Sequence, residues 1–240
     1  MKTEPEKHIL KYGTRRIEYN LIRRPRRSMR IVVLPDLKVY VYVPPRASDG
    51  QILTAIGKKT RWIARKLDMM ECYHPLPVSK QFISGETFKY LGRQYRLKVS
   101  NGKSNQIKLK GKYLCISCNA ANNRAKVKKL VEGWYRTRAK EILTHYVSKA
   151  LDTAYRHGIP KPIISIRKMT RRWGSCSSSG RITLNIKLLE APLDCIEYVI
   201  MHELCHLKYQ NHSKGFYTLL TRCQHDWRKR KETLDKMSVY

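Results

Sequence analysis

The stretch HELCHLKYQNHSKGF, residues 202–216, constrains the fold of this chain more than any other. His202 and His206 are four residues apart, so their imidazoles project from the same face of an α-helix. Two imidazoles placed in this way can bind one zinc ion at about 2.0–2.1 Å each. Glu203 lies about 100° further around the helix, close to such a metal without being a ligand. A general base for a metal-activated water requires this position.

A catalytic zinc ion has three protein ligands and one open position. The next histidine, His212, can turn back toward the metal only if the helix ends between it and His206. We expect the break near Asn211, because asparagine tolerates left-handed backbone. Ser213 is then expected to cap a following helix over residues 214–227. The sequence therefore predicts one zinc ion per chain, held by three imidazoles.

Two other residues bear on this site. Tyr209 stands where the metzincin pattern has a glycine, which argues against membership of that group. His225 lies on the following predicted helix and is kept as a reserve ligand. The other histidines have no such neighbours in the sequence and are interpreted as ordinary surface or core residues.

The segment over residues 191–210 has the apolar spacing of a helix with one buried face. Asp194 and Glu197, three residues apart, resemble a capping box at its start. The apolar positions that define the buried face are Ile196, Val199, Ile200, Leu204 and Leu207.

The first half of the chain is rich in strand patterns. Residues 14–25 and a hairpin of 30–35 with 38–43 precede a helix expected over 49–71, with Ser48 as its N-cap. Short strands are expected again over 87–118, after a proline-containing loop. We interpret Cys115 and Cys118 of the CISC sequence as strand residues, because side chains three apart point to opposite faces. A zinc knuckle is the alternative.

The second half begins with the clearest helix pattern, which starts near residue 122 and ends at His157-Gly158. Strands are expected over 163–169 and 181–189, on either side of a loop at 170–180. Residues 228–240 are basic and form a last short helix or a frayed tail. The expected fold class is α+β: a β-rich region with one helix over 1–121, then a more helical region with a small sheet over 122–240. A single continuous domain over 7–237 is the alternative.

The charge is strongly positive, with 50 Lys and Arg against 18 Asp and Glu and a formal net charge of +32. Such a charge attracts polyanions, which include nucleic acid, nucleotides, anionic lipid surfaces and acidic proteins. A generally basic protein without a specific anion site is equally consistent with it. The start of the chain lacks the apolar core of a signal peptide, and no run approaches the roughly 18 apolar residues of a membrane span. Seven scattered cysteines fit a reducing compartment. We therefore expect a cytoplasmic protein that does not act in a membrane.

The motifs RWGSC (172–176), LN (184–185), HELCHL (202–207) and NHSKGFY (211–217) together resemble the YgjP-like metallopeptidase family. The resemblance extends over nearly the whole chain, including YNLIRRPRRSMRIVV, KKTRWIARK and SGETFKYLGRQYRLKV. That family is similar to the SprT-like and WLM zinc peptidases. The resemblance implies a zincin-like catalytic half in which the helix supplies HExxH and His212 supplies the third ligand. Tyr217 stands where relatives often have tryptophan, a change with little bearing on the metal.

The resemblance implies that Glu203 takes a proton from the zinc-bound water and passes it to the leaving group. The developing oxyanion needs a stabilising group. Arg172, Ser175, Tyr217 and the backbone of residues 173–176 are the candidates.

Two further residues near these motifs have two interpretations each. Trp173 contacts substrate or simply packs in the core. The strand that ends at Asn185 is either an edge strand on which an extended peptide lies or an ordinary sheet strand.

We expect a zinc-dependent metallopeptidase acting on proteins or peptides, with nucleic-acid-associated proteins suggested by analogy with the related families. A metal-dependent hydrolase of nucleotide phosphoanhydrides is the alternative, although the chain has no P-loop. A non-enzymatic nucleic-acid-binding protein with a structural zinc is the second alternative. Glu203 beside an open coordination position favours catalysis. The oligomeric state stays open.

Overall fold

A computed structural model describes residues 5–34, 36–71, 80–170 and 172–237. The chain divides into two compact units, Met1–Ser79 and Lys80–Tyr240. We call them unit 1 and unit 2 and describe each by itself. The division lies between residues 79 and 80, whereas the boundary expected from the sequence lies between residues 121 and 122.

Unit 1 contains a four-stranded sheet with the order β1-β2-β4-β3. β2 pairs antiparallel with β1 and parallel with β4, and β4 pairs antiparallel with β3. The predicted hairpin is therefore confirmed as β3 and β4, although Pro35 of its turn lies outside the described residues. The strands are β1 (Glu6–Tyr12), β2 (Arg15–Arg23), β3 (Arg30–Val33) and β4 (Val39–Val43).

The helix predicted over 49–71 is two helices, α1 (Asp49–Gly57) and α2 (Thr60–Glu71). Ser48 caps α1 as predicted, in a capping box with Gln51. The break follows Gly57, where the buried Thr60 hydroxyl donates to the Ile56 carbonyl at 3.1 Å. That bond satisfies a carbonyl group at the helix end and lets the chain change direction.

Unit 2 begins with a second four-stranded sheet of order β5-β6-β8-β7. Cys115 is partly exposed and Cys118 is buried on β8, so the interpretation of CISC as strand residues is confirmed. The strands are β5 (Thr87–Tyr90), β6 (Arg93–Asn101), β7 (Gln106–Lys110) and β8 (Tyr113–Cys118).

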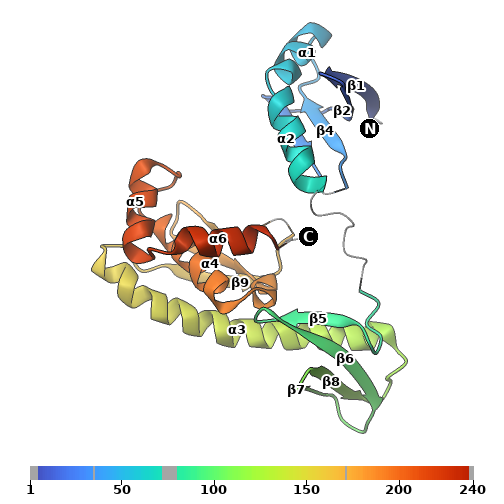
Figure 1. The fold of residues 1–240 in the computed structure, drawn as a ribbon, viewed down its shortest axis with the longest axis vertical. Coiled ribbons are helices and arrows are strands. Elements are labelled where there is room, and N and C mark those ends of the chain that lie inside the picture. The colour runs from blue at the N-terminus through green and yellow to red at the C-terminus, as the bar shows by residue number, and fades with distance from the viewer. Residues whose placement is uncertain (1–4, 35, 72–79, 171, 238–240) are drawn as a thin grey trace. The chain divides into compact units, whose positions relative to one another are not determined.

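Helix α3 (Arg124–Arg156) runs along unit 2 from this sheet toward the C-terminal helices (Figure 1). Asn123 caps its start, since its side chain accepts from the Lys126 amide at 3.0 Å. Its end follows the predicted signal, because Gly158 adopts a left-handed φ of 67°. Among the described helices, none, α3 included, combines the length and the apolarity needed to cross a membrane.

Contacts between α3 and the second sheet explain why that sheet belongs to unit 2. The Tyr135 hydroxyl donates to the Lys89 carbonyl at 2.5 Å, and the Tyr90 and Trp134 rings lie 5.0 Å apart. The Leu91 amide also donates to the Leu189 carbonyl, at 2.6 Å. The sheet over 87–118 is thus held by residues far along the chain. A domain boundary placed from sequence composition alone does not take such contacts into account.

The third sheet has three strands in the order β10-β11-β9. β11 pairs with a neighbour on each side, so of the two interpretations of the strand ending at Asn185, the ordinary sheet strand is confirmed and the edge strand is wrong. The predicted loop contains the short β10, and the predicted strand over 181–189 continues after Asn185 as a 3₁₀ helix, η1 (Ile186–Glu190). The strands are β9 (Ile163–Arg167), β10 (Gly174–Cys176) and β11 (Arg181–Asn185).

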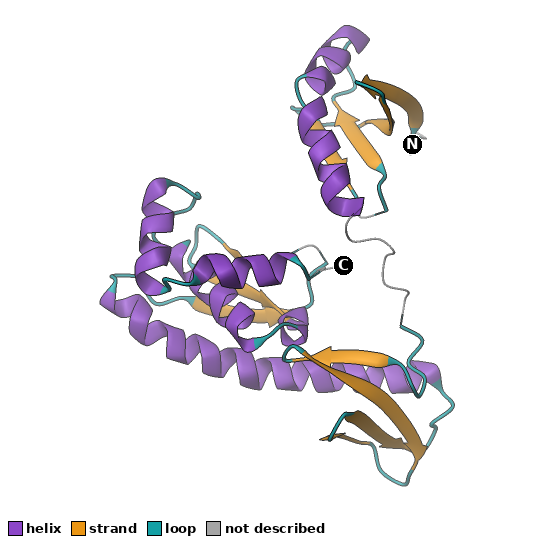
Figure 2. Ribbon diagram, in the orientation of Figure 1, coloured by secondary structure: helices purple, strands orange, loops and turns teal. Residues whose placement is uncertain are grey.

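Three helices complete unit 2: α4 (Leu193–Cys205), α5 (Lys214–Cys223) and α6 (Trp227–Asp235). Their apolar faces join α3, η1 and β11 in one buried cluster. Ser213 caps α5 as predicted. Figure 2 shows helices and strands in both units, so the expected α+β class is confirmed.

The predicted capping box at the start of α4 is absent, since Pro192 is the N-cap and makes no side-chain cap bond. Glu197 instead pairs with Arg230 of α6 at 2.6 Å and with Lys149 of α3 at 3.1 Å. Burial alone would raise the pKa of Glu197, but the hydrogen bonds from Arg230 and Lys149 outweigh it and hold the pKa below its usual value. This carboxylate therefore ties three helices together.

Glu197→Gln is expected to lower the free energy of unfolding by about 1–2 kcal/mol at pH 7. Because the folded-state pKa is depressed, the contribution is present above the unfolded value of about 4.3 and is lost as the pH falls through the folded value. The free energies of unfolding of the two proteins, measured by urea titration, should thus approach each other as the pH falls below about 4.3. Asp194→Asn is the matched control, and an equal effect of both changes would contradict the role of Glu197.

Candidate metal centre

The candidate site forms where helix α4 ends. His202 and Glu203 lie in the last turn of α4, and His206 is its C-cap residue with φ −66° and ψ −18°. The helix predicted over 191–210 thus ends at Cys205. The chain turns through bonds such as Leu207 N to Leu204 O at 3.0 Å, and Asn211 is not in the left-handed region. The hydrogen-bonded turn after Cys205, and not a left-handed Asn211, therefore returns His212 toward His202 and His206.

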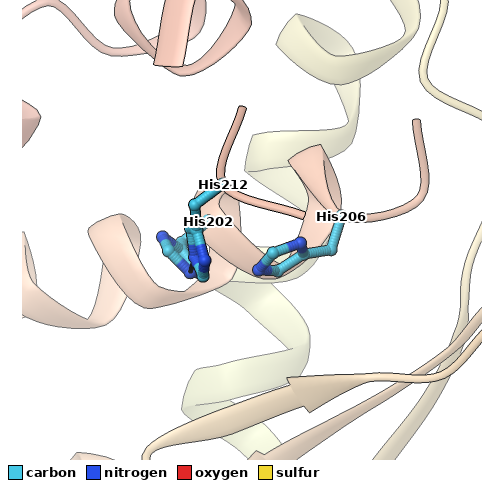
Figure 3. Close-up of side chains that lie close together, drawn as sticks. All are labelled: His202, His206 and His212. Atoms are coloured by element: carbon cyan, nitrogen blue, oxygen red, sulfur yellow. Dashed lines mark hydrogen bonds between the residues drawn. The ribbon is translucent and has the colours of Figure 1, made fainter. Parts of the chain in front are cut away.

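The three predicted imidazoles lie together. Each offers a nitrogen within 4.8 Å of the others, and the Nε2 atoms of His202 and His212 are 3.1 Å apart. The ring centroids of the three pairs are separated by 4.7–5.0 Å. Figure 3 shows the ring of His206 directed toward the other two.

Hydrogen bonds at the Nδ1 atoms orient two of the rings. The Nδ1 atom of His206 is 3.0 Å from the Tyr209 carbonyl oxygen, which can only accept, so this nitrogen carries the proton. The Nδ1 atom of His202 lies 3.4 Å from the Tyr198 hydroxyl. The bond to Tyr209 therefore fixes the tautomer of neutral His206 and leaves its Nε2 atom for a metal.

Phe216 is fully buried and lies against all three imidazoles, with ring centroids 4.6–5.0 Å away. It belongs to the first turns of α5, whose start is set by the Ser213 cap. The packing of α5 thereby restricts the orientation of rings that come from two different segments.

The electrostatic surroundings favour neutral imidazoles. Burial, together with the neighbouring His206 and His212, lowers the pKa of His202 to about 3. Burial, and then His206, also lowers the pKa of His212. Neutral imidazole is the form that binds metal ions, so the lowered pKa values of His202 and His212 favour metal binding by these two rings.

The donor set fits zinc. Ligand nitrogens of a tetrahedral zinc ion with bonds of about 2.0–2.1 Å lie roughly 3.3 Å apart. The 3.1 Å between His202 and His212 Nε2 is close to that value. Three imidazoles are also the donors that zinc prefers over oxygen-seeking cations. His225, the reserve ligand, is exposed and lies outside the one such cluster found among the described residues.

Glu203 is buried, with 7% of its surface exposed, and lies against β10. The approach to Gly174 is so close that a Cβ atom there would come within 2.7 Å of Glu203 Oε1. Burial raises the pKa of Glu203 to about 7, and the positive charge of Arg172 partly offsets the rise. Glycine at position 174 therefore leaves room for the carboxylate.

The remaining predicted site residues differ in their surroundings. Arg172 is exposed, Ser175 is half-buried on β10, and Trp173 packs partly buried against the core. Asn185 is fully buried, where its amide donates to the Met169 and Arg172 carbonyls. Its side chain therefore orders the loop before β10 and has no access to a substrate. Tyr217 is 38% exposed, 6.0 Å from the His212 ring and stacked on Trp227.

Three residues that contact the predicted site residues were not identified from the sequence: Tyr198, Phe216 and Gly174. Tyr198 is four residues before His202, a spacing that places both on one helix face and could have revealed the contact. Phe216 and Gly174 gave no comparable signal, because their roles depend on the packing of α5 and β10 against α4.

Residues 27–237 match the YgjP-like metallopeptidase domain. The chain belongs to this family. It is accordingly a hydrolase of the metallopeptidase class, as the resemblance in its motifs implied. The match includes the three clustered histidines, Glu203 and β10, and it extends over most of unit 1.

Two solved structures are similar to part of the chain. The metallopeptidase zymogen abylysin of Pyrococcus abyssi aligns with a TM-score of 0.34 and 22% identity, over 38% of this chain and 90% of that one. The metallopeptidase zymogen jannalysin of Methanocaldococcus jannaschii has the same TM-score and identity, over 38% of this chain and 92% of that one. A comparison with curated proteins gave no match.

Gly174→Ala is expected to lower peptidase activity by about 10- to 100-fold, because the new methyl group displaces the Glu203 carboxylate. The measurement is casein hydrolysis, with the metal content determined in parallel and expected to stay unchanged. Gly133→Ala is the matched control, since a Cβ atom there meets nothing within 4 Å. Wild-type activity in Gly174→Ala would show that this contact does not position the carboxylate.

Proposed function

We propose that the chain hydrolyses peptide bonds with one zinc ion held by His202, His206 and His212 and with Glu203 as the acid–base residue. The observation that carries the proposal is the convergence of three imidazoles next to one buried carboxylate. When bound, zinc acidifies a water molecule and polarises the scissile carbonyl group.

Glu203 has the position of a proton carrier. It is adjacent in sequence to a ligand but points toward β10, where Gly174 leaves space beside it. In the proposed reaction its carboxylate accepts a proton from the attacking water and then donates it to the leaving amine. A buried carboxylate makes this transfer without competition from bulk water.

β10 is the edge strand next to Glu203, and we propose that an extended peptide pairs with it. The Trp173 carbonyl and the Ser177 amide both bond to β11, at 2.9 Å each. Backbone groups alternate in direction along a strand, so those of Gly174 and Cys176 face the open edge. The peptide-binding role that was one interpretation of the Asn185 strand thus belongs, in this proposal, to its neighbour β10.

Arg172 and Tyr217 are the proposed stabilisers of the oxyanion. The charge of Arg172 reaches Glu203, and the Tyr217 ring lies 6.0 Å from that of His212. Both side chains are exposed, so a substrate can reach them. Ser175, half-buried in β10, is the weaker candidate.

The net charge of +32 supports protein substrates that are associated with nucleic acid, because such complexes carry exposed phosphates. It also attracts free nucleotides, so nucleotide hydrolysis is the competing activity to be tested. A cytoplasmic location stays a prediction.

Protein purified without chelator is expected to contain about one zinc ion per chain, measured by inductively coupled plasma mass spectrometry. His212→Ala should reduce the zinc content several-fold, and its exposed position in the turn before α5 leaves the fold intact. His225→Ala removes an exposed imidazole outside the cluster and should keep the wild-type content. Equal zinc in both variants would remove His212 from the ligand set.

Glu203→Gln is expected to keep the zinc ion and to lose about 100- to 10,000-fold in peptide hydrolysis. Glu190→Gln is the matched control: it is another glutamate with a pKa raised by burial, but its charged neighbours are Lys187, Lys89 and Lys80. The same proteins are assayed with casein and with nucleoside triphosphates. Glu203-dependent hydrolysis of the nucleotides alone would replace peptidase activity by the competing one.

A further inference from the structure

Among the described residues of unit 1, helices α1 and α2 cover one face of the sheet and no helix covers the other. Val39, Val41 and Val43 of β4 are buried in a cluster with Ile56 and Ile63 of α1 and α2. Both helices accompany the sheet in Figure 1, and their apolar residues join this one cluster. Tyr40 and Tyr42 alternate with the valines, so they project from the opposite face, where each is partly exposed.

The two tyrosines form an aromatic surface at the centre of that face. Their rings are stacked, with centroids 6.3 Å apart and planes inclined by 17°. The Arg24 guanidinium lies 5.5 Å from the centre of the Tyr42 ring. Flat, partly exposed rings in line along a strand are the groups on which unpaired nucleic-acid bases stack.

Cations surround these rings. Strand register places Lys7, Asn20, Tyr40 and Val32 in one row across the sheet. Arg30 is opposite Tyr42 in the next row. We use the name open face for the surface formed by Lys7, Lys11, Arg24, Arg30, Tyr40 and Tyr42.

Among the described residues of unit 1, no carboxylate pairs with the four cations of the open face. Glu18 is the one acidic side chain that the described strands direct to this face. Residues 1–79 as a whole contain 17 Lys and Arg against 7 Asp and Glu. The field at this surface therefore attracts a polyanion.

We propose that the open face binds single-stranded nucleic acid, with bases stacked on Tyr40 and Tyr42 and phosphates contacting the surrounding cations. An acidic peptide would satisfy the charges but has no planar groups for the two rings. A duplex would present phosphates but keeps its bases stacked within the helix. The combination of stacked rings and unpaired cations fits a single strand better than either.

This binding is independent of the hydrolytic site. It involves residues of unit 1 alone, whereas the clustered histidines and Glu203 belong to unit 2. Binding is therefore measured with the full chain carrying Glu203→Gln, so that neither hydrolysis nor its absence affects the result.

The test is fluorescence anisotropy with a labelled oligothymidine of about 15 nucleotides at an ionic strength of about 0.15 M. Tyr40→Leu and Tyr42→Leu should each weaken binding by about 5- to 150-fold, the range for loss of one stacking ring. Leucine keeps the apolar volume and the net charge. A loss of affinity therefore reports stacking and not the general attraction of a basic protein.

Matched variants separate the open face from the rest of the unit. Trp62→Leu removes a 43% exposed ring from α2 and should leave affinity unchanged. Tyr40→Phe and Tyr42→Phe should bind like the wild type. The double variant Arg24→Gln with Arg30→Gln should reduce the steepness of the plot of log binding constant against log salt concentration by about 0.7 per lost phosphate contact. The double variant Lys58→Gln with Lys59→Gln should leave this slope unchanged. Thermal melts by circular dichroism verify that every variant is folded.

Several outcomes would overturn the proposal. One is wild-type affinity in folded Tyr40→Leu and Tyr42→Leu proteins, and another is an equal loss in Trp62→Leu. Competition by polyglutamate as strong as that by the oligonucleotide would assign the face to acidic proteins. Equal or tighter binding of a hairpin duplex would exclude recognition of a single strand.

Discussion

The end of helix α4 at Cys205 is the constraint on which the candidate site depends. Six further residues of continuous helix would carry His212 about 9 Å along the axis from His206, too far for a shared metal ion. Instead the chain turns at once, with the Tyr209 amide bonded to the Cys205 carbonyl at 3.0 Å. The Tyr209 carbonyl then accepts from His206 Nδ1. The same turn thus ends the helix, returns the third histidine and orients the second.

Neutrality of the imidazoles is the second condition. In a chain with a net charge of +32, three protonated histidines side by side would repel one another and any cation. Burial against Phe216 and Tyr198 favours the uncharged form instead. The site consequently presents nitrogen lone pairs, and the positive charge is left to side chains at the surface. Packing of α5 on α4 is therefore a requirement of the chemistry as well as of the fold.

The parts of this arrangement that follow from local spacing could be predicted. The histidines of α4, the Ser213 cap, the end of α3 at Gly158 and the hairpin of β3 and β4 all depend on residues within a few positions of one another. The misses depend on partners distant in sequence. β10 is a strand because β11 pairs with it. Glu197 forms an ion pair with Arg230 and does not cap the start of α4. The sheet over 87–118 is held by hydrogen bonds to Tyr135 and Leu189. The two interpretations of the strand ending at Asn185 could not be separated from the sequence, because they differ in whether that strand pairs with both β9 and β10.

Charge alone cannot distinguish the two units, since residues 80–240 contain 33 Lys and Arg against 11 Asp and Glu. Both units attract polyanions, and this attraction weakens with salt and does not depend on sequence or strandedness. Selectivity has to come from groups whose interaction depends on geometry. In unit 1 we propose that those groups are Tyr40 and Tyr42, because planar rings stack on unpaired bases and not on bases paired within a duplex. In unit 2 they are the three imidazoles, whose ligand atoms lie within 4.8 Å of one another. The two proposals therefore fail or succeed separately, because no residue serves both.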